Sequence, residues 1–88
     1  MSIIYPAQFE EDFEEVYEGG YPFLVSIGFV VTFRDVPEAI TQGDNFLRTI
    51  DMAKDALLVA LKLYDERGQA RPTASAPIQG DVMISLGG

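Results

Sequence analysis

The strongest constraint on the fold is a run of alternating apolar side chains that ends in a proline turn. Between residues 21 and 33 every odd position is aromatic or aliphatic, whereas small or polar residues hold most of the even positions. Such alternation predicts a strand with one buried apolar face and one more exposed face. The run is long for a single strand, so we expect a bend or bulge at residues 26–28. Pro37 ends the strand because proline has no N–H for strand pairing.

Shorter signals place three further strands around this one. Residues 3–9 form an apolar-rich run that predicts the first strand, and residues 39–42 are expected to return as a short third strand. A Pro/Ser/Ala-rich linker without periodicity spans residues 69–80, and residues 81–86 have the apolar content of a last strand. With one helix between the third and last strands, the order is β-β-β-α-β. This order indicates an α+β fold in which one helix packs on a small, mostly antiparallel sheet.

The helix is expected over residues 45–67. Asp44 or Asn45 can cap its first turn, and Gly68 ends it. Its apolar stripe recurs at spacings of three and four and consists of Phe46, Ile50, Ala53, Leu57, Leu61 and Tyr64. One side of the helix is therefore expected to cover the sheet.

Three further apolar residues lie beside this stripe: Leu58, Val59 and Leu63. A helix that is nearly apolar around its middle covers more than one surface. The second surface belongs either to another copy of the chain or to a partner protein. The long aromatic strand adds to the uncovered apolar surface, because one helix cannot fully cover it. We therefore expect a homo-oligomer, with Leu58, Val59 and Leu63 as its contact.

The acidic residues are concentrated near the N-terminus of a chain whose net charge is −8. Residues 1–33 hold six acids and no Lys or Arg, and the remaining residues hold eight acids and six bases. Nucleic-acid backbones are bound through Lys and Arg, so direct contact with nucleic acid is not expected. A basic protein partner suits this segment, and the candidate contacts are Glu10, Glu11, Glu14 and Glu15. The alternative is a solvated acidic surface that only aids solubility. The segment itself is either a short acidic helix or an extension of a hairpin.

Composition excludes several kinds of site. The chain has no cysteine and no histidine, which removes disulfides, thiol nucleophiles and the usual zinc ligand sets. No apolar run approaches the roughly 18 residues of a membrane span, and the N-terminus lacks the basic start of a signal peptide. The expectation is a soluble cytoplasmic protein that needs no cofactor.

Five short motifs occur in a fixed order along the chain. They are YPAQF at residues 5–9, FRDVP at 33–37, EAITQGD at 38–44, AKDAL at 53–57 and GQARPTAS at 68–75. In this order and spacing they resemble the HicB-like antitoxins of bacterial toxin–antitoxin pairs. The resemblance implies a partial ribonuclease-H-like fold, an oligomeric assembly and neutralisation of a small basic toxin of the HicA type that cleaves messenger RNA.

The chain departs from this family in two places. Residues 10–28 are longer than the usual first hairpin connection and are interpreted as a family-atypical insertion. Many members also carry a C-terminal operator-binding domain, whereas residues 1–88 are interpreted as a single HicB-like domain without one. Operator binding is therefore not carried over from the resemblance.

A metal-dependent nuclease is the enzymatic alternative, since the implied fold is that of a nuclease. Such a site needs several converging carboxylates, and Asp35, Glu38 and Asp44 are the candidates at strand ends. Asp35 is better interpreted as a turn former and Asp44 as a helix cap, so we expect no catalytic or metal-binding residues. The remaining alternative is a homo-oligomeric structural or regulatory domain without a toxin.

Overall fold

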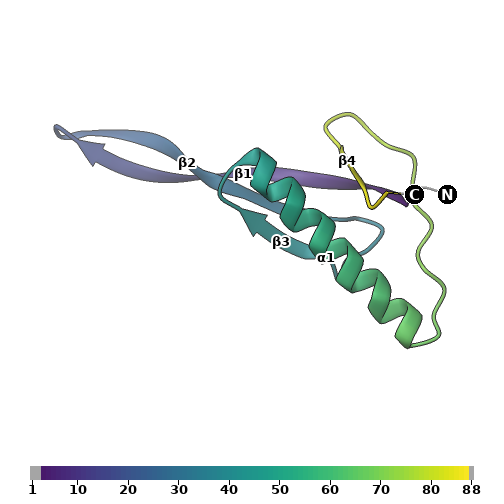
Figure 1. The fold of residues 1–88 in the computed structure, drawn as a ribbon. Helices are drawn as coiled ribbons and strands as arrows, with labels where there is room; N and C mark the ends of the chain where they lie inside the picture. Colours follow the sequence, from purple (N-terminus) through teal and green to yellow (C-terminus); the bar gives the residue numbers. More distant parts are fainter. Residues whose placement is uncertain (1–2, 88) are drawn as a thin grey trace.

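A long hairpin made by the first two strands organises the chain (Figure 1). The computed structural model describes residues 3–87, and its elements are β1 (Ile4–Glu18), β2 (Tyr21–Thr32), β3 (Ile40–Gly43), α1 (Phe46–Glu66) and β4 (Val82–Ser85). The sheet has the order β3-β2-β1-β4, and each neighbouring pair is antiparallel. The α+β fold and the element order expected from the sequence are confirmed.

The core lies between α1 and the part of the sheet near β3 and β4, away from the tip of the hairpin. Its largest fully buried apolar side chains come from every layer and include Val31, Phe33, Val36, Leu57, Leu61 and Ile84. The proline turn belongs to this core, because the N–H of Val36 donates to the carbonyl of Phe33 at 3.2 Å and the Val36 side chain is buried. The turn therefore anchors the end of β2 instead of leading into a free loop.

The helix begins and ends where the sequence predicts. Asn45 is the N-cap, and its side-chain Oδ1 accepts a hydrogen bond from the N–H of Arg48 at 2.9 Å. Of the two capping residues that the sequence allowed, the structure therefore selects Asn45 over Asp44. At the other end Arg67 is the C-cap, followed by Gly68 with φ +66°. Within residues 3–87 no helix is long and apolar enough to cross a membrane.

A bulge divides the hairpin. On β1, Asp12 lies opposite Gly28 and Phe13 lies opposite Ser26, so Ile27 is an extra residue on β2. Gly28 has φ +126°, and a Cβ there would lie 2.1 Å from the carbonyl oxygen of Gly43. The bend expected at residues 26–28 is thus present, and only glycine fits at position 28, directly after the extra residue.

The bulge also corrects the expectation of one continuous buried face. One extra residue reverses the alternation, so odd positions before Ile27 face the side opposite to odd positions after it. Val31 and Phe33 are buried, but Tyr21 is 77% exposed and Phe23 is 44% exposed. The prediction of a core face is wrong for residues 21–27.

Beyond the bulge the hairpin continues as a two-stranded projection, residues 13–26, which we call the arm (Figure 1). β3 pairs with β2 only from Phe29 to Thr32, so neither β3 nor β4 pairs with the arm. The radius of gyration is 15.7 Å, whereas a compact domain of this length has about 12 Å. The acidic segment is therefore a strand of an extended hairpin and not a helix.

Three aromatic rings mark the base of the arm. The centroids of Phe9 and Phe29 lie 5.4 and 5.7 Å from that of Phe46, and 6.3 Å from each other. These separations are typical of attractive aromatic contacts. They join the start of α1 to both strands of the hairpin just before the bulge.

Because β2 and β3 approach closely at Gly28, substitution of Gly28 is expected to reduce the free energy of unfolding more than substitution of Gly80, which lies in open space. Gly80→Ala meets no atom within 4 Å but keeps a positive φ of +92°, so we expect a cost of about 1 kcal/mol. Gly28→Ala adds a clash with the Gly43 carbonyl, and we expect a loss of about 3 kcal/mol or more. Urea unfolding of both variants measures this, and equal losses would contradict the close approach.

Candidate functional site

The four acids predicted to bind a partner lie along β1, from the base of the arm outward. Glu10, Glu11, Glu14 and Glu15 are all exposed. Strand alternation puts Glu10 and Glu14 on one face of the hairpin and Glu11 and Glu15 on the other. They therefore form no single cluster but line the length of one strand.

These acids have no basic partner within the described part of the chain. Their cross-strand neighbours on β2 are uncharged: Val30, Phe29, Val25 and Leu24. Within residues 3–87 the ion pairs join Arg34 to Asp81 and Arg71 to Asp65, away from the arm. The strand thus presents uncompensated negative charge to solvent.

Exposed aromatic side chains alternate with the acids. On one face of the hairpin, Phe13 is 52% and Tyr17 is 70% exposed. Tyr21 and Phe23 are exposed on the other face, because their cross-strand neighbours are Glu18 and Val16. The Glu15 carboxylate beside Tyr17 raises the pKa of the Tyr17 hydroxyl. Aromatic residues are enriched in protein–protein interfaces. The sequence indicated that one helix cannot fully cover the long aromatic strand, but it did not show which aromatic side chains are exposed.

The three apolar residues predicted as an oligomer contact are exposed but do not form one surface. Leu58 borders a hollow with Lys54 and the end of β4, whereas Val59 and Leu63 border another with Thr41. At 100° per residue, Leu58 and Leu63 lie about 140° apart around the helix. A single flat contact therefore does not cover all three, and their role stays a prediction.

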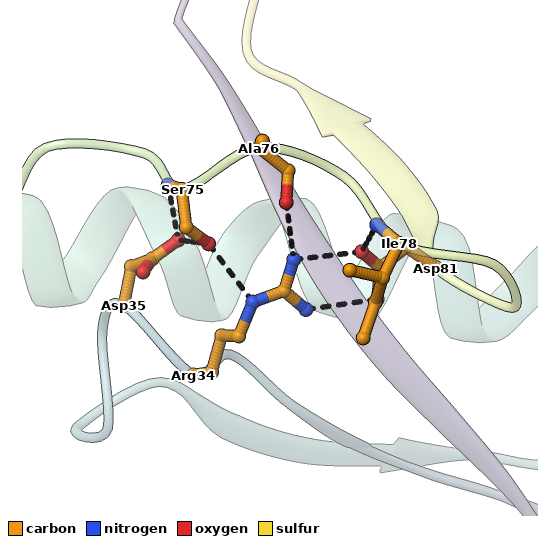
Figure 2. A network of polar contacts seen from close by, with 6 residues as sticks. All are labelled: Arg34, Asp35, Ser75, Ala76, Ile78 and Asp81. Atoms are coloured by element: carbon orange, nitrogen blue, oxygen red, sulfur yellow. Dashed lines mark hydrogen bonds and ion pairs between the residues drawn. The ribbon is translucent and has the colours of Figure 1, made fainter.

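A polar network fastens the linker to the end of β2 (Figure 2). The Arg34 guanidinium donates to both carboxylate oxygens of Asp81 at 2.9 and 2.8 Å, to the Ser75 hydroxyl at 2.8 Å and to the Ala76 carbonyl at 3.0 Å. Asp35 accepts hydrogen bonds from the N–H and hydroxyl of Ser75, both at 2.9 Å. Hydrogen bonding by Arg34, supported by the Ile78 N–H, lowers the pKa of Asp81 to about 2. The aperiodic linker is thus held in place by charge-assisted hydrogen bonds.

The three carboxylates considered for a nuclease site are not brought together as one metal-binding set. Asp35 bonds the linker through Ser75, and Glu38 accepts a hydrogen bond from the Tyr64 hydroxyl at 2.8 Å. Asp44 precedes the capping residue Asn45 and is exposed. Within residues 3–87 no three acidic side chains come together as a set that could hold a metal ion.

Comparison with known proteins gives a consistent match. A family described as HicB_like antitoxin of bacterial toxin-antitoxin system matches residues 4–87. Antitoxin HicB of Escherichia coli (strain K12) is 44% identical over 59 residues, which cover 67% of this chain and 43% of that protein. Antitoxin HicB 1 of Photorhabdus laumondii is 39% identical over 73 residues, covering 83% and 42%. Antitoxin HicB 2 of the same organism is 37% identical over 82 residues, covering 93% and 48%. The chain spans less than half the length of these curated relatives.

The Arg34–Asp81 pair predicts an acid-sensitive contribution to stability. The pKa of Asp81 is about 2 in the folded chain, against about 3.9 for an unperturbed aspartate. The lowered pKa stabilises the fold above about pH 4, and this stabilisation is lost as the pH falls toward 2. Asp81→Asn removes it, so the variant should lose less stability between pH 5 and pH 2.5 than the wild type.

Urea unfolding at several pH values measures the difference. Asp51→Asn, at an exposed position of α1, is the control and should keep the acid sensitivity of the wild type. Identical acid profiles for Asp81→Asn and the wild type would show that the Arg34–Asp81 pair does not stabilise the fold.

Proposed function

The chain belongs to the HicB-like antitoxins of bacterial toxin–antitoxin systems, and we propose that it neutralises a small basic toxin of the HicA type by direct protein contact. Such a toxin cleaves messenger RNA, so the proposed place of action is the cytoplasm. The observation that carries the proposal is the free, acidic outer edge of β1.

This edge offers both charge and backbone groups to a partner. β4 pairs with β1 only from Ile4 to Ala7, so the outer edge of β1 has no paired strand among the described residues beyond Ala7. Over residues 10–18 it carries Glu10, Glu11, Asp12, Glu14, Glu15 and Glu18. Acidic side chains steer a basic partner toward the edge, and exposed aromatic side chains supply apolar contact after docking.

The same charges support a role in protein binding instead of catalysis or nucleic-acid contact. A nucleic-acid backbone would be repelled by the arm, since its contacts require Lys and Arg. The candidate carboxylates Asp35 and Glu38 are committed to hydrogen bonds with Ser75 and Tyr64. The proposed activity is therefore masking of the toxin by contact, with no reaction carried out by the antitoxin.

We also propose that the chain self-associates. The arm has no buried residue of its own from Phe13 to Ser26, although many of its side chains are apolar. An isolated two-stranded hairpin is marginally stable in water. A further contact that covers part of the arm would stabilise it.

The steering role predicts a large effect on association rate. Reversing Glu10, Glu11, Glu14 and Glu15 to Lys should slow association with the toxin at least about tenfold at low salt. The wild-type rate should fall as salt rises, because exposed charges are screened within about 8 Å at physiological ionic strength. The measurement uses a small basic toxin of the HicA type, with binding kinetics at two salt concentrations.

A matched control reverses four exposed acids outside β1: Asp44, Asp51, Asp55 and Glu66. It changes the net charge equally, so a loss confined to the β1 variant locates the binding surface. Equal slowing by both variants would show that net charge alone, and not the acids of β1, sets the association rate. An association rate that does not change with salt would indicate that the acidic residues only aid solubility.

We expect no nuclease activity from the purified chain. Single- and double-stranded RNA and DNA should remain intact with Mg²⁺ or Mn²⁺, since Asp35 is hydrogen bonded to the linker. Gel analysis over several hours, beside a metal-dependent nuclease as positive control, measures this. Cleavage that disappears in Asp35→Asn would overturn the proposal that the chain acts only by binding.

A further inference from the structure

The two strands of the arm have opposite edge chemistry. β1 carries six acids between residues 10 and 18, whereas β2 and the residue after it carry no charge from Tyr21 to Phe33. Edge strands of soluble proteins are normally protected against pairing by charges, prolines or short length. β1 has such protection along its whole arm segment. β2 has only Pro22 near the tip and the bulge at Ile27 near the base.

The β2 edge is open over most of the arm. β3 covers β2 only from Phe29 to Thr32, and no other described strand pairs with residues 23–27 on that side (Figure 1). Apolar side chains lie on both faces of this segment, with Phe23 and Val25 on one face and Leu24 on the other. A strand that is apolar on both faces and uncharged is typical of the interior of a sheet.

We propose that residues 23–27 of β2 pair antiparallel with the same residues of a second copy, across a two-fold axis. The two hairpins then form one ribbon of four strands in the order β1-β2-β2′-β1′. Such an interface is isologous, since the same segment serves both copies. The inference rests on the proposed self-association and specifies its surface; it does not depend on a toxin.

Charge decides between this arrangement and the other possible edges. Neighbouring strands lie about 4.8 Å apart, so the two acidic β1 strands would be separated by about 14 Å across three spacings. This exceeds the Debye length of about 8 Å at physiological salt, and their repulsion is largely screened. Pairing through β1 would instead put twelve acids on two adjacent strands. A basic partner would bind the β2 edge poorly, because residues 21–33 carry no charge.

The arrangement also meets the needs of the arm itself. Three or more strands are required for an independently stable sheet, and the ribbon supplies four. Phe23, Leu24 and Val25 gain cross-strand neighbours, which contribute by contact of apolar side chains. Both acidic β1 edges remain on the outside of the dimer, where each is free to bind a basic partner.

The first test compares two substitutions with the same change of charge. Val25→Lys places a cation in the proposed interface, opposite Glu14 within its own hairpin, so the arm retains a favourable pair. Phe13→Lys makes the same change on β1. Analytical ultracentrifugation at tens of micromolar should give a dimer dissociation constant at least tenfold larger for Val25→Lys than for the wild type. The constant for Phe13→Lys should be unchanged.

A second test does not depend on the folding of the Lys variant. The chain has no cysteine, so a single introduced cysteine reports proximity between two copies without ambiguity. Opposed residues of an antiparallel pair have Cα atoms about 4.5–5.5 Å apart, within the range of a disulfide. Single cysteines through residues 23–27 should include at least one that forms a covalent dimer on oxidation, and Glu14→Cys on β1 should form none.

The outcomes separate this inference from the proposals above. A dimer that survives Val25→Lys and forms no cross-link overturns the assignment to β2, and dissociation by Leu58→Glu would then place the contact on α1. A monomeric wild type overturns self-association as well. Toxin binding is measured independently through charge reversal on β1, so its failure would leave the dimer result unchanged.

Discussion

The close approach of Gly28 to the carbonyl of Gly43 determines how the rest of the structure is arranged. It fixes the bulge at the point where β3 stops pairing with β2, and thereby separates a packed domain from an uncovered arm. On the domain side of the bulge, the aromatic rings of Phe9, Phe29 and Phe46 connect the hairpin to α1. Beyond the bulge neither β3 nor β4 pairs with these two strands, so their side chains are available to other molecules.

A second constraint acts at the opposite end of the sheet. The linker after α1 has no regular structure, yet Arg34 and Asp35 hold it through Ser75, Ala76 and Asp81 (Figure 2). This positions β4 beside β1, which completes the sheet and buries Ile84. Asp35, one of the three carboxylates considered for a nuclease site, thus helps to hold the linker through its hydrogen bonds with Ser75.

Segregation of charge gives the arm two different surfaces. The acidic outer edge of β1 suits the basic partner proposed for this HicB-like antitoxin, and the uncharged edge of β2 suits a second copy of the chain. In that arrangement self-association and toxin binding use opposite edges and do not compete. Dimerisation would present two acidic edges, and two binding sites on one assembly raise the avidity for partners that are themselves linked.

Local signals in the sequence were sufficient for the elements: the cap at Asn45, the glycine after the helix and the turn at Val36-Pro37 each act within a few residues. They placed all four strands in order and the helix to within a residue or two. The first strand was expected only over residues 3–9, whereas β1 continues to Glu18 through the acidic segment, which the sequence left open between a helix and a hairpin extension. What the sequence left open or wrong was the face of each side chain along the hairpin. One extra residue at Ile27 reverses the alternation, and whether a third strand covers the hairpin depends on contacts between Gly28 and Gly43, which are distant in the chain. Exposure of Tyr21 and Phe23 was therefore decided only by the tertiary structure, because burial is a property of what packs against a strand and not of the strand itself.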